Sequence, residues 1–103
     1  MSLDDDKSGA SLMRAFDALE YLSGHAVHGA ANKDLAAAMR CSPTNVTRTA
    51  AALMKKGWVE RDEATGYFRI TSRFSRLVHR VDAAFDRAQA QLDERKRNYT
   101  LSN

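Results

Sequence analysis

The stretch "CSPTNVTRTA" at residues 41–50 carries side chains that suit recognition of a nucleic acid. Arg and Asn can form paired hydrogen bonds with base edges in the major groove of DNA, and the Thr methyl can contact the thymine methyl. On a helix with 100° per residue, Val46 and Leu53 fall on one side and Arg48 on the opposite side. The outward stripe is small, hydroxylic or cationic and contains no acid. It predicts a DNA-reading helix whose candidate contact residues are Thr44, Asn45, Thr47, Arg48 and Lys55.

Poor helix formers occupy several positions of this helix. A surface helix with only a structural role favours Glu, Lys, Gln and Ala, because propensity decides where packing does not. The alternative is that Thr and Asn accumulate at helix starts as caps and local hydrogen-bonding groups. Local bonding accounts for Thr44 and in part for Asn45, but it covers Thr47 and Thr49 poorly. The composition therefore favours a reading surface.

Helix-start residues and glycines divide the chain into elements that would position this surface. Ser11 is expected to cap a first helix over 11–23, and Asn32 a second helix of about two turns. Ser42 is expected to cap the third helix, with Pro43 in the first helical position, where a missing N–H costs nothing. This third helix should extend from about residue 43 to 56.

The sequence after Gly57 alternates as in short strands. Segments 58–61 and 67–70 predict a hairpin with Phe68 and Ile70 on one face. Beyond it the chain lacks Gly and Pro from Ser72 to about Asn98, as in a helix.

Together these elements predict a mainly α fold with a small two-stranded antiparallel hairpin, a winged helix-turn-helix with a long C-terminal helix. The expected divisions are a disordered segment at 1–10, a DNA-binding domain at 11–71, and a C-terminal dimerisation helix with a short tail at 72–103.

The hairpin adds two candidate DNA contacts, Arg61 and Arg69, which would approach phosphates or the minor groove beside the third helix. Exposed arginines are common on two-stranded ribbons. The alternative is therefore that they pair with the neighbouring acids, which are Glu60, Asp62 and Glu63.

Charge and composition limit the classes of protein to which the chain can belong. The 103 residues have a net charge of +3, and residues 40–80 carry nine Lys/Arg against three Asp/Glu, or +6. Such a basic region indicates a polyanion as partner, and a solvated basic surface is the alternative. No apolar run is long enough to span a membrane and no signal peptide is evident. The single Cys41 fits a reducing cytoplasm.

Other chemistries find little support in the sequence. His25, His28 and Cys41 lack the ligand spacing of a structural zinc site. There is no nucleophile motif, phosphate-binding loop or paired-carboxylate arrangement. We therefore expect neither an enzyme nor a cofactor, and no small-molecule effector is evident.

Residues 11–70 resemble the N-terminal winged-helix domain of IclR-type bacterial transcriptional regulators. The resemblance rests on "SLMRAFDALEYL", "LAAAMRCSPTNVTRTAAALMKKGWVERD" and "ATGYFRI". It implies a winged helix, duplex DNA as ligand and dimers formed partly through the first helix. Arg40 departs from the usual Gly of the turn, and Thr49 and Ala50 replace leucines. Such regulators continue into an effector-binding domain well beyond 103 residues, so ligand sensing is not carried over.

The C-terminal helix has an apolar stripe with coiled-coil spacing. Its members are Phe74, Val78, Val81, Phe85, Ala88 and Leu92. This predicts a homodimer through residues 11–23 and 74–92, with two reading helices about one DNA turn apart. Folding of the helix back onto its own domain is the alternative.

The leading hypothesis is a sequence-reading DNA-binding regulator, bacterial or phage-borne and a repressor by operator occupancy. Two alternatives remain: a protein-interaction module on a winged-helix fold, and a non-specific architectural DNA-binding protein.

Overall fold

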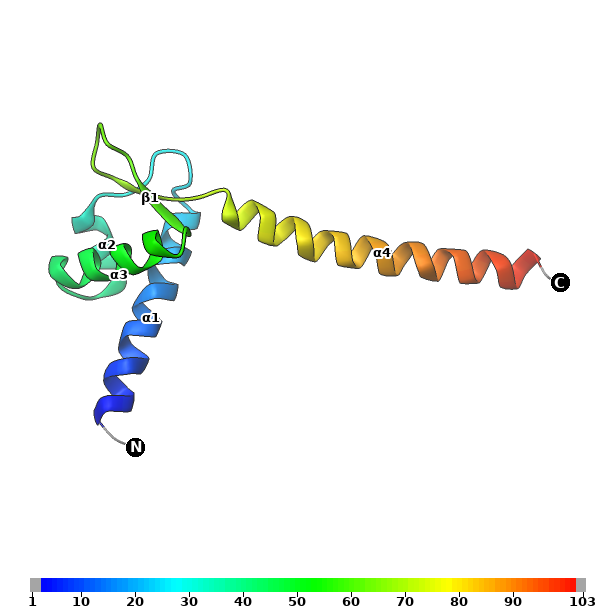
Figure 1. Cartoon of the computed structure of the whole chain (residues 1–103), viewed down its shortest axis with the longest axis horizontal. Coiled ribbons are helices and arrows are strands. Elements are labelled where there is room, and N and C mark those ends of the chain that lie inside the picture. The colour runs from blue at the N-terminus through cyan, green and yellow to red at the C-terminus, as the bar shows by residue number, and fades with distance from the viewer. Residues whose placement is uncertain (1–2, 102–103) are drawn as a thin grey trace. The chain divides into compact units, whose positions relative to one another are not determined.

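The computed structural model describes residues 3–101, with side chains from residue 9 onward. Its elements are α1 (Leu3–Ser23), α2 (Asn32–Met39), α3 (Pro43–Lys55), β1 (Val59–Arg61), β2 (Phe68–Ile70) and α4 (Arg73–Leu101) (Figure 1). The expected order and the fold class, mainly helical with a two-stranded antiparallel hairpin, are confirmed. The chain divides between Arg73 and Phe74 into two compact units, which are described separately.

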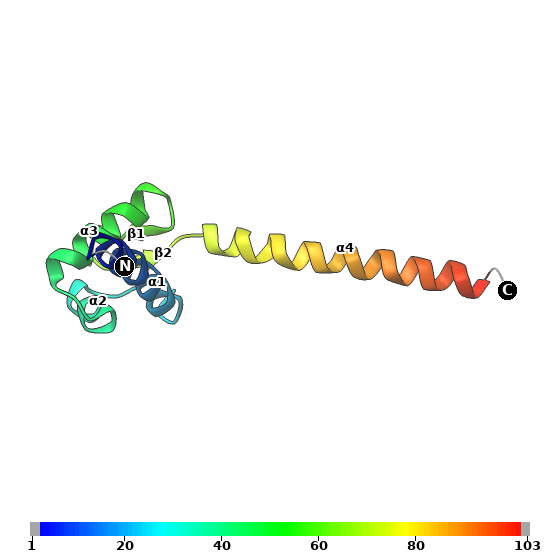
Figure 2. The same ribbon diagram turned by 90° about the horizontal axis from the view of Figure 1, so that it is seen from below.

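One small apolar core holds the first unit together. Helices α2 and α3 pack against each other, and both contact α1 (Figures 1 and 2). The largest fully buried side chains are Leu22, Leu35 and Val46, one from each helix. Each contributes about 1.5–3 kcal/mol by leaving water. Val59 and Phe68 extend the core under the hairpin.

The start of α3 follows the prediction, whereas two other helix starts do not. Ser42 Oγ accepts a hydrogen bond from the Asn45 N–H at 3.2 Å, and Pro43 is the first helical residue. Ser11 lies inside α1, so its assignment as an N-cap was wrong. Asn32 is not a cap either, because Ala31 occupies that position without a side-chain bond.

Helix α1 begins at Leu3, so the prediction of a disordered segment was wrong for residues 3–10. Nothing in the following residues stops the helix before Gly24. The prediction for residues 1 and 2 lies outside the described residues.

A left-handed residue closes the turn between α2 and α3. Arg40 has φ 55° and ψ 50°, the conformation in which Gly is favoured at a helix C-terminus. Its N–H and that of Cys41 bond to carbonyls of the last turn of α2. The turn therefore keeps the geometry that a glycine would take, at a cost of about 1–2 kcal/mol for a residue with a Cβ.

The loop between α1 and α2 adds a single paired residue to the hairpin. Strands β1 and β2 pair in antiparallel register, with Glu60 opposite Arg69. On the other edge of β2, Ala30 and Phe68 exchange two N–H···O bonds of 2.9 Å each. Gly29 precedes this bridge at φ +78°, and a Cβ there would clash with the Phe68 carbonyl oxygen.

The second unit is the long helix α4, which extends to Leu101 and so passes the expected end near Asn98. At 1.5 Å per residue its 29 residues span about 44 Å. None of its described side chains is buried. Residues 99–101 of the predicted C-terminal tail are therefore helical, and residues 102 and 103 lie outside the described residues.

Gly29→Ala should destabilise the first unit by about 2–3 kcal/mol, because it adds strain at positive φ and a clash with fixed backbone. Gly24→Ala is the matched control, since its Cβ would meet only the Tyr21 carbonyl at 3.6 Å. Chemical denaturation of the two variants would measure the difference. Equal stabilities would show that the Ala30 bridge adapts to a side chain at residue 29.

Candidate nucleic-acid interface

Helix α3 presents the predicted outward stripe to solvent. Val46 is 0% exposed, and Ala50 and Leu53 are also buried. On the opposite side Thr44, Thr47, Arg48, Ala51, Ala52 and Lys55 are exposed, and Asn45 and Thr49 are half-buried. Among the described side chains neither Arg48 nor Lys55 forms an ion pair. Both cations are therefore available to an external anion.

Thr47 has a role inside the fold. Its Oγ1 donates to the Pro43 carbonyl at 3.1 Å and accepts from Asn32 Nδ2 at 3.2 Å. The same Asn32 nitrogen donates to the Pro43 carbonyl at 3.2 Å. The interpretation that local hydrogen bonding covers Thr47 poorly was therefore wrong. These bonds join the start of α2 to the first turn of α3. Because Asn32 resembled a helix cap, the sequence did not indicate this second role.

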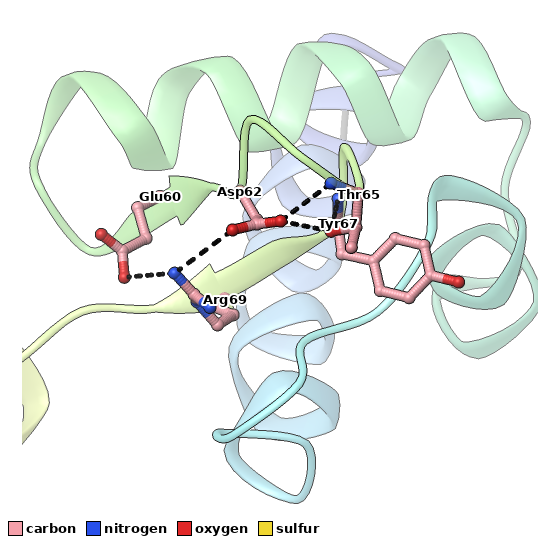
Figure 3. Close-up of polar contacts among 5 residues, drawn as sticks. All are labelled: Glu60, Asp62, Thr65, Tyr67 and Arg69. Atoms are coloured by element: carbon pink, nitrogen blue, oxygen red, sulfur yellow. Dashed lines mark hydrogen bonds and ion pairs between the residues drawn. The ribbon is translucent and has the colours of Figure 1, made fainter.

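The wing arginines are engaged by other groups of the hairpin. Arg69 Nη2 lies 3.5 Å from Glu60 Oε1 and 3.9 Å from Asp62 Oδ1, so pairing with acids holds for this residue (Figure 3). Arg61 Nε donates to the Gly66 carbonyl at 3.1 Å, and its guanidinium lies 5.2 Å from the Phe68 ring centre. The charge of Arg61 is thus not neutralised by an acid. To bind DNA, Arg69 would have to leave its carboxylate partners and pair with phosphates instead.

The tip of the hairpin is organised by Asp62. Its Oδ2 accepts hydrogen bonds from the N–H and the hydroxyl of Thr65, each 2.8 Å long (Figure 3). Thr65 Oγ1 in turn accepts from the Tyr67 N–H at 3.1 Å, and the Tyr67 ring points away from this cluster. The Thr65 bonds, and secondarily the charge of Arg69, hold the pKa of Asp62 below its ordinary value of 3.8. The sequence indicated Asp62 only as a possible partner of the wing arginines.

Features of other protein classes are not found in the described residues. Residues 3–101 contain no group of three or more His, Cys, Asp and Glu side chains that could hold a metal ion. No helix in that range is both long enough and apolar enough to cross a membrane.

A tight helix-turn-helix followed by a paired hairpin defines a winged-helix domain, whose exposed α3 bears the cationic stripe. A family model described as the MarR family matches residues 13–66, more than half of the chain. The chain therefore belongs to the MarR family. Searches of curated proteins and of solved structures gave no match.

Family membership settles the class of function. The protein is a DNA-binding transcription regulator rather than an enzyme. The winged-helix part of the resemblance to IclR-type regulators is confirmed, but the match does not support the IclR type itself.

Removing the Thr65 hydroxyl should raise the pKa of Asp62 toward its ordinary value. A carboxyl whose pKa is lowered on folding favours the folded state above its unfolded pKa, and this contribution disappears as the pH falls through the folded pKa. The wing turn should therefore weaken below about pH 4. Carboxyl ¹³C shifts followed by NMR would give the pKa in Thr65→Ala and in Arg69→Gln. The larger rise is expected for Thr65→Ala, and the reverse order would contradict the assignment.

Proposed function

We propose that this protein is a cytoplasmic, sequence-reading regulator that inserts α3 into the major groove of duplex DNA and represses by occupying its operator. The observation that carries the proposal is the exposed, acid-free stripe of α3, with Arg48 and Lys55 unpaired among the described side chains. A solvated structural surface has no need to exclude acids, whereas phosphate repels them.

The residues of the stripe differ in the contacts that they offer. Arg48 lies at its centre and can bond both acceptors of a guanine edge, and Asn45 can pair with adenine. Thr44 is exposed in the first turn and can contact a thymine methyl or a phosphate. Lys55 is in the last turn, where it would bind phosphate. In the wing, Arg61 would contact the backbone, with Arg69 contributing less because of its acidic partners.

Arg48→Ala should weaken binding to the preferred duplex by about 1–3 kcal/mol and relax base choice at one position. Lys55→Ala should instead weaken binding to all duplexes alike and flatten the salt dependence, because a phosphate contact carries no sequence information. Selection from a random duplex pool, followed by titrations at two salt concentrations, would test both variants. Equal losses on preferred and random DNA for both variants would indicate non-specific architectural binding instead.

We also propose that the protein acts as a homodimer whose interface is formed by apolar residues of α1 and α4. In α4, Val78, Val81, Phe85 and Leu92 are each more than half exposed and follow the spacing of a coiled-coil seam. In α1, Leu12, Met13 and Phe16 are also more than half exposed. A second copy would cover these side chains and present two α3 helices to the half-sites of a palindromic operator.

Phe85 is 73% exposed and central in the seam, so Phe85→Glu should convert a dimer into a monomer at micromolar concentration. Ala90→Glu is the matched control, because residue 90 lies about 140° around the helix from residue 85. Sedimentation velocity would report the mass of each variant. A wild-type protein that sediments as a monomer, or equal masses for the two variants, would refute this interface.

A further inference from the structure

A groove of about 380 Å³ lies between α1 and α3, on the flank of the proposed reading surface. Among the residues whose side chains are described, three cations line it, Arg14 of α1, Arg48 of α3 and Lys56 directly after α3, and none of these lining residues is an acid. Ser11, Asn45 and Thr49 add polar groups, and the remaining lining residues are small or apolar. Three positive charges around one hollow repel one another unless an anion lies between them.

Arg14 is half-buried beside this groove. Its Nη2 donates to Ser11 Oγ at 3.3 Å. Its Nε–H is buried and has no hydrogen-bond partner within the described part of the chain. A buried, unsatisfied donor on a charged group is costly in a native protein, and a nearby anion would offset part of that cost.

The groove shares no residue with the apolar side chains of α1 proposed for the dimer, which are Leu12, Met13 and Phe16. At 100° per residue, Leu12 and Phe16 each lie about 160° around the helix from Arg14. Arg14 and Ala15 line the groove beside α3, whereas Leu12, Met13 and Phe16 are more than half exposed and are not part of its lining. The groove would thus remain open in a dimer formed through those apolar residues.

We propose that this groove binds a backbone phosphate of the DNA strand that borders the major groove occupied by α3, with Arg14 as its principal ligand. This inference rests on the proposed function, since Arg48 and Asn45 belong both to the groove and to the reading surface. A phosphate there would place α1 against the backbone beside α3 and fix the register of the reading helix.

The test compares Arg14→Gln, Arg14→Lys and Arg97→Gln for binding to one preferred duplex between 50 and about 300 mM salt. Losing one phosphate contact should make the slope of log affinity against log salt concentration shallower by about 0.9, which corresponds to an affinity roughly eightfold lower at 0.1 M salt. Arg14→Gln should show both this shallower slope and this lower affinity, and the changes should be equal on preferred and on random duplexes. Arg14→Lys should retain most of the affinity, because it keeps the charge.

Arg97→Gln removes the same charge from an exposed position of α4 and should leave the affinity and the slope unchanged. Binding by Arg14→Gln with the wild-type affinity and slope would overturn the phosphate site while leaving the proposed function intact. Equal losses in Arg14→Gln and Arg14→Lys would also overturn it, because they would indicate a structural role for the guanidinium. Failure of the wild-type protein to bind any duplex would instead refute the proposed function.

Discussion

The burial of one side of α3 is the constraint on which the rest of the structure depends. Val46 has no exposed surface, and Ala50 and Leu53 lie one turn apart on the same side. A rotation by one residue position would turn the helix by 100° and bring polar side chains into the core. The hydrogen bonds from Asn32 to Pro43 and Thr47 oppose the same rotation at the first turn. Core packing thus decides which side chains of α3 point outward.

The hairpin is held in position by the same apolar core. Phe68 is buried in the core, lies opposite Arg61 in the strand register, and exchanges its backbone hydrogen bonds with Ala30 in the loop after α1. Two three-residue strands alone would be marginal in water. The extra bridge and the apolar anchor give this short wing a defined place beside α3. Its tip is then shaped by Asp62 and Thr65 rather than by packing.

The structure could be predicted from the sequence where a local pattern is compatible with one structure only. The division of α3 into buried and exposed sides follows from spacing alone, and Ser42 with Pro43 is a specific start signal. The prediction failed where one residue type can serve several structural or functional roles. Asn32 and Thr47 are residue types that cap helices, read bases or bond locally, and only the distance between α2 and α3 shows that they bond each other. The groove at Arg14 could not be predicted, because it joins residues more than thirty positions apart.

The turn at Arg40 shows how this small core imposes conformation on an unfavourable residue. A left-handed residue with a Cβ costs about 1–2 kcal/mol. A positive charge at the C-terminus of a helix recovers about 0.3–1 kcal/mol, which does not offset that cost. The difference is supplied by the packing of α2 against α3, in which Leu35, Met39 and Val46 are all buried. Burial of these side chains, at about 1.5–3 kcal/mol each, exceeds the cost of the turn, so the angle that presents α3 is set by tertiary packing.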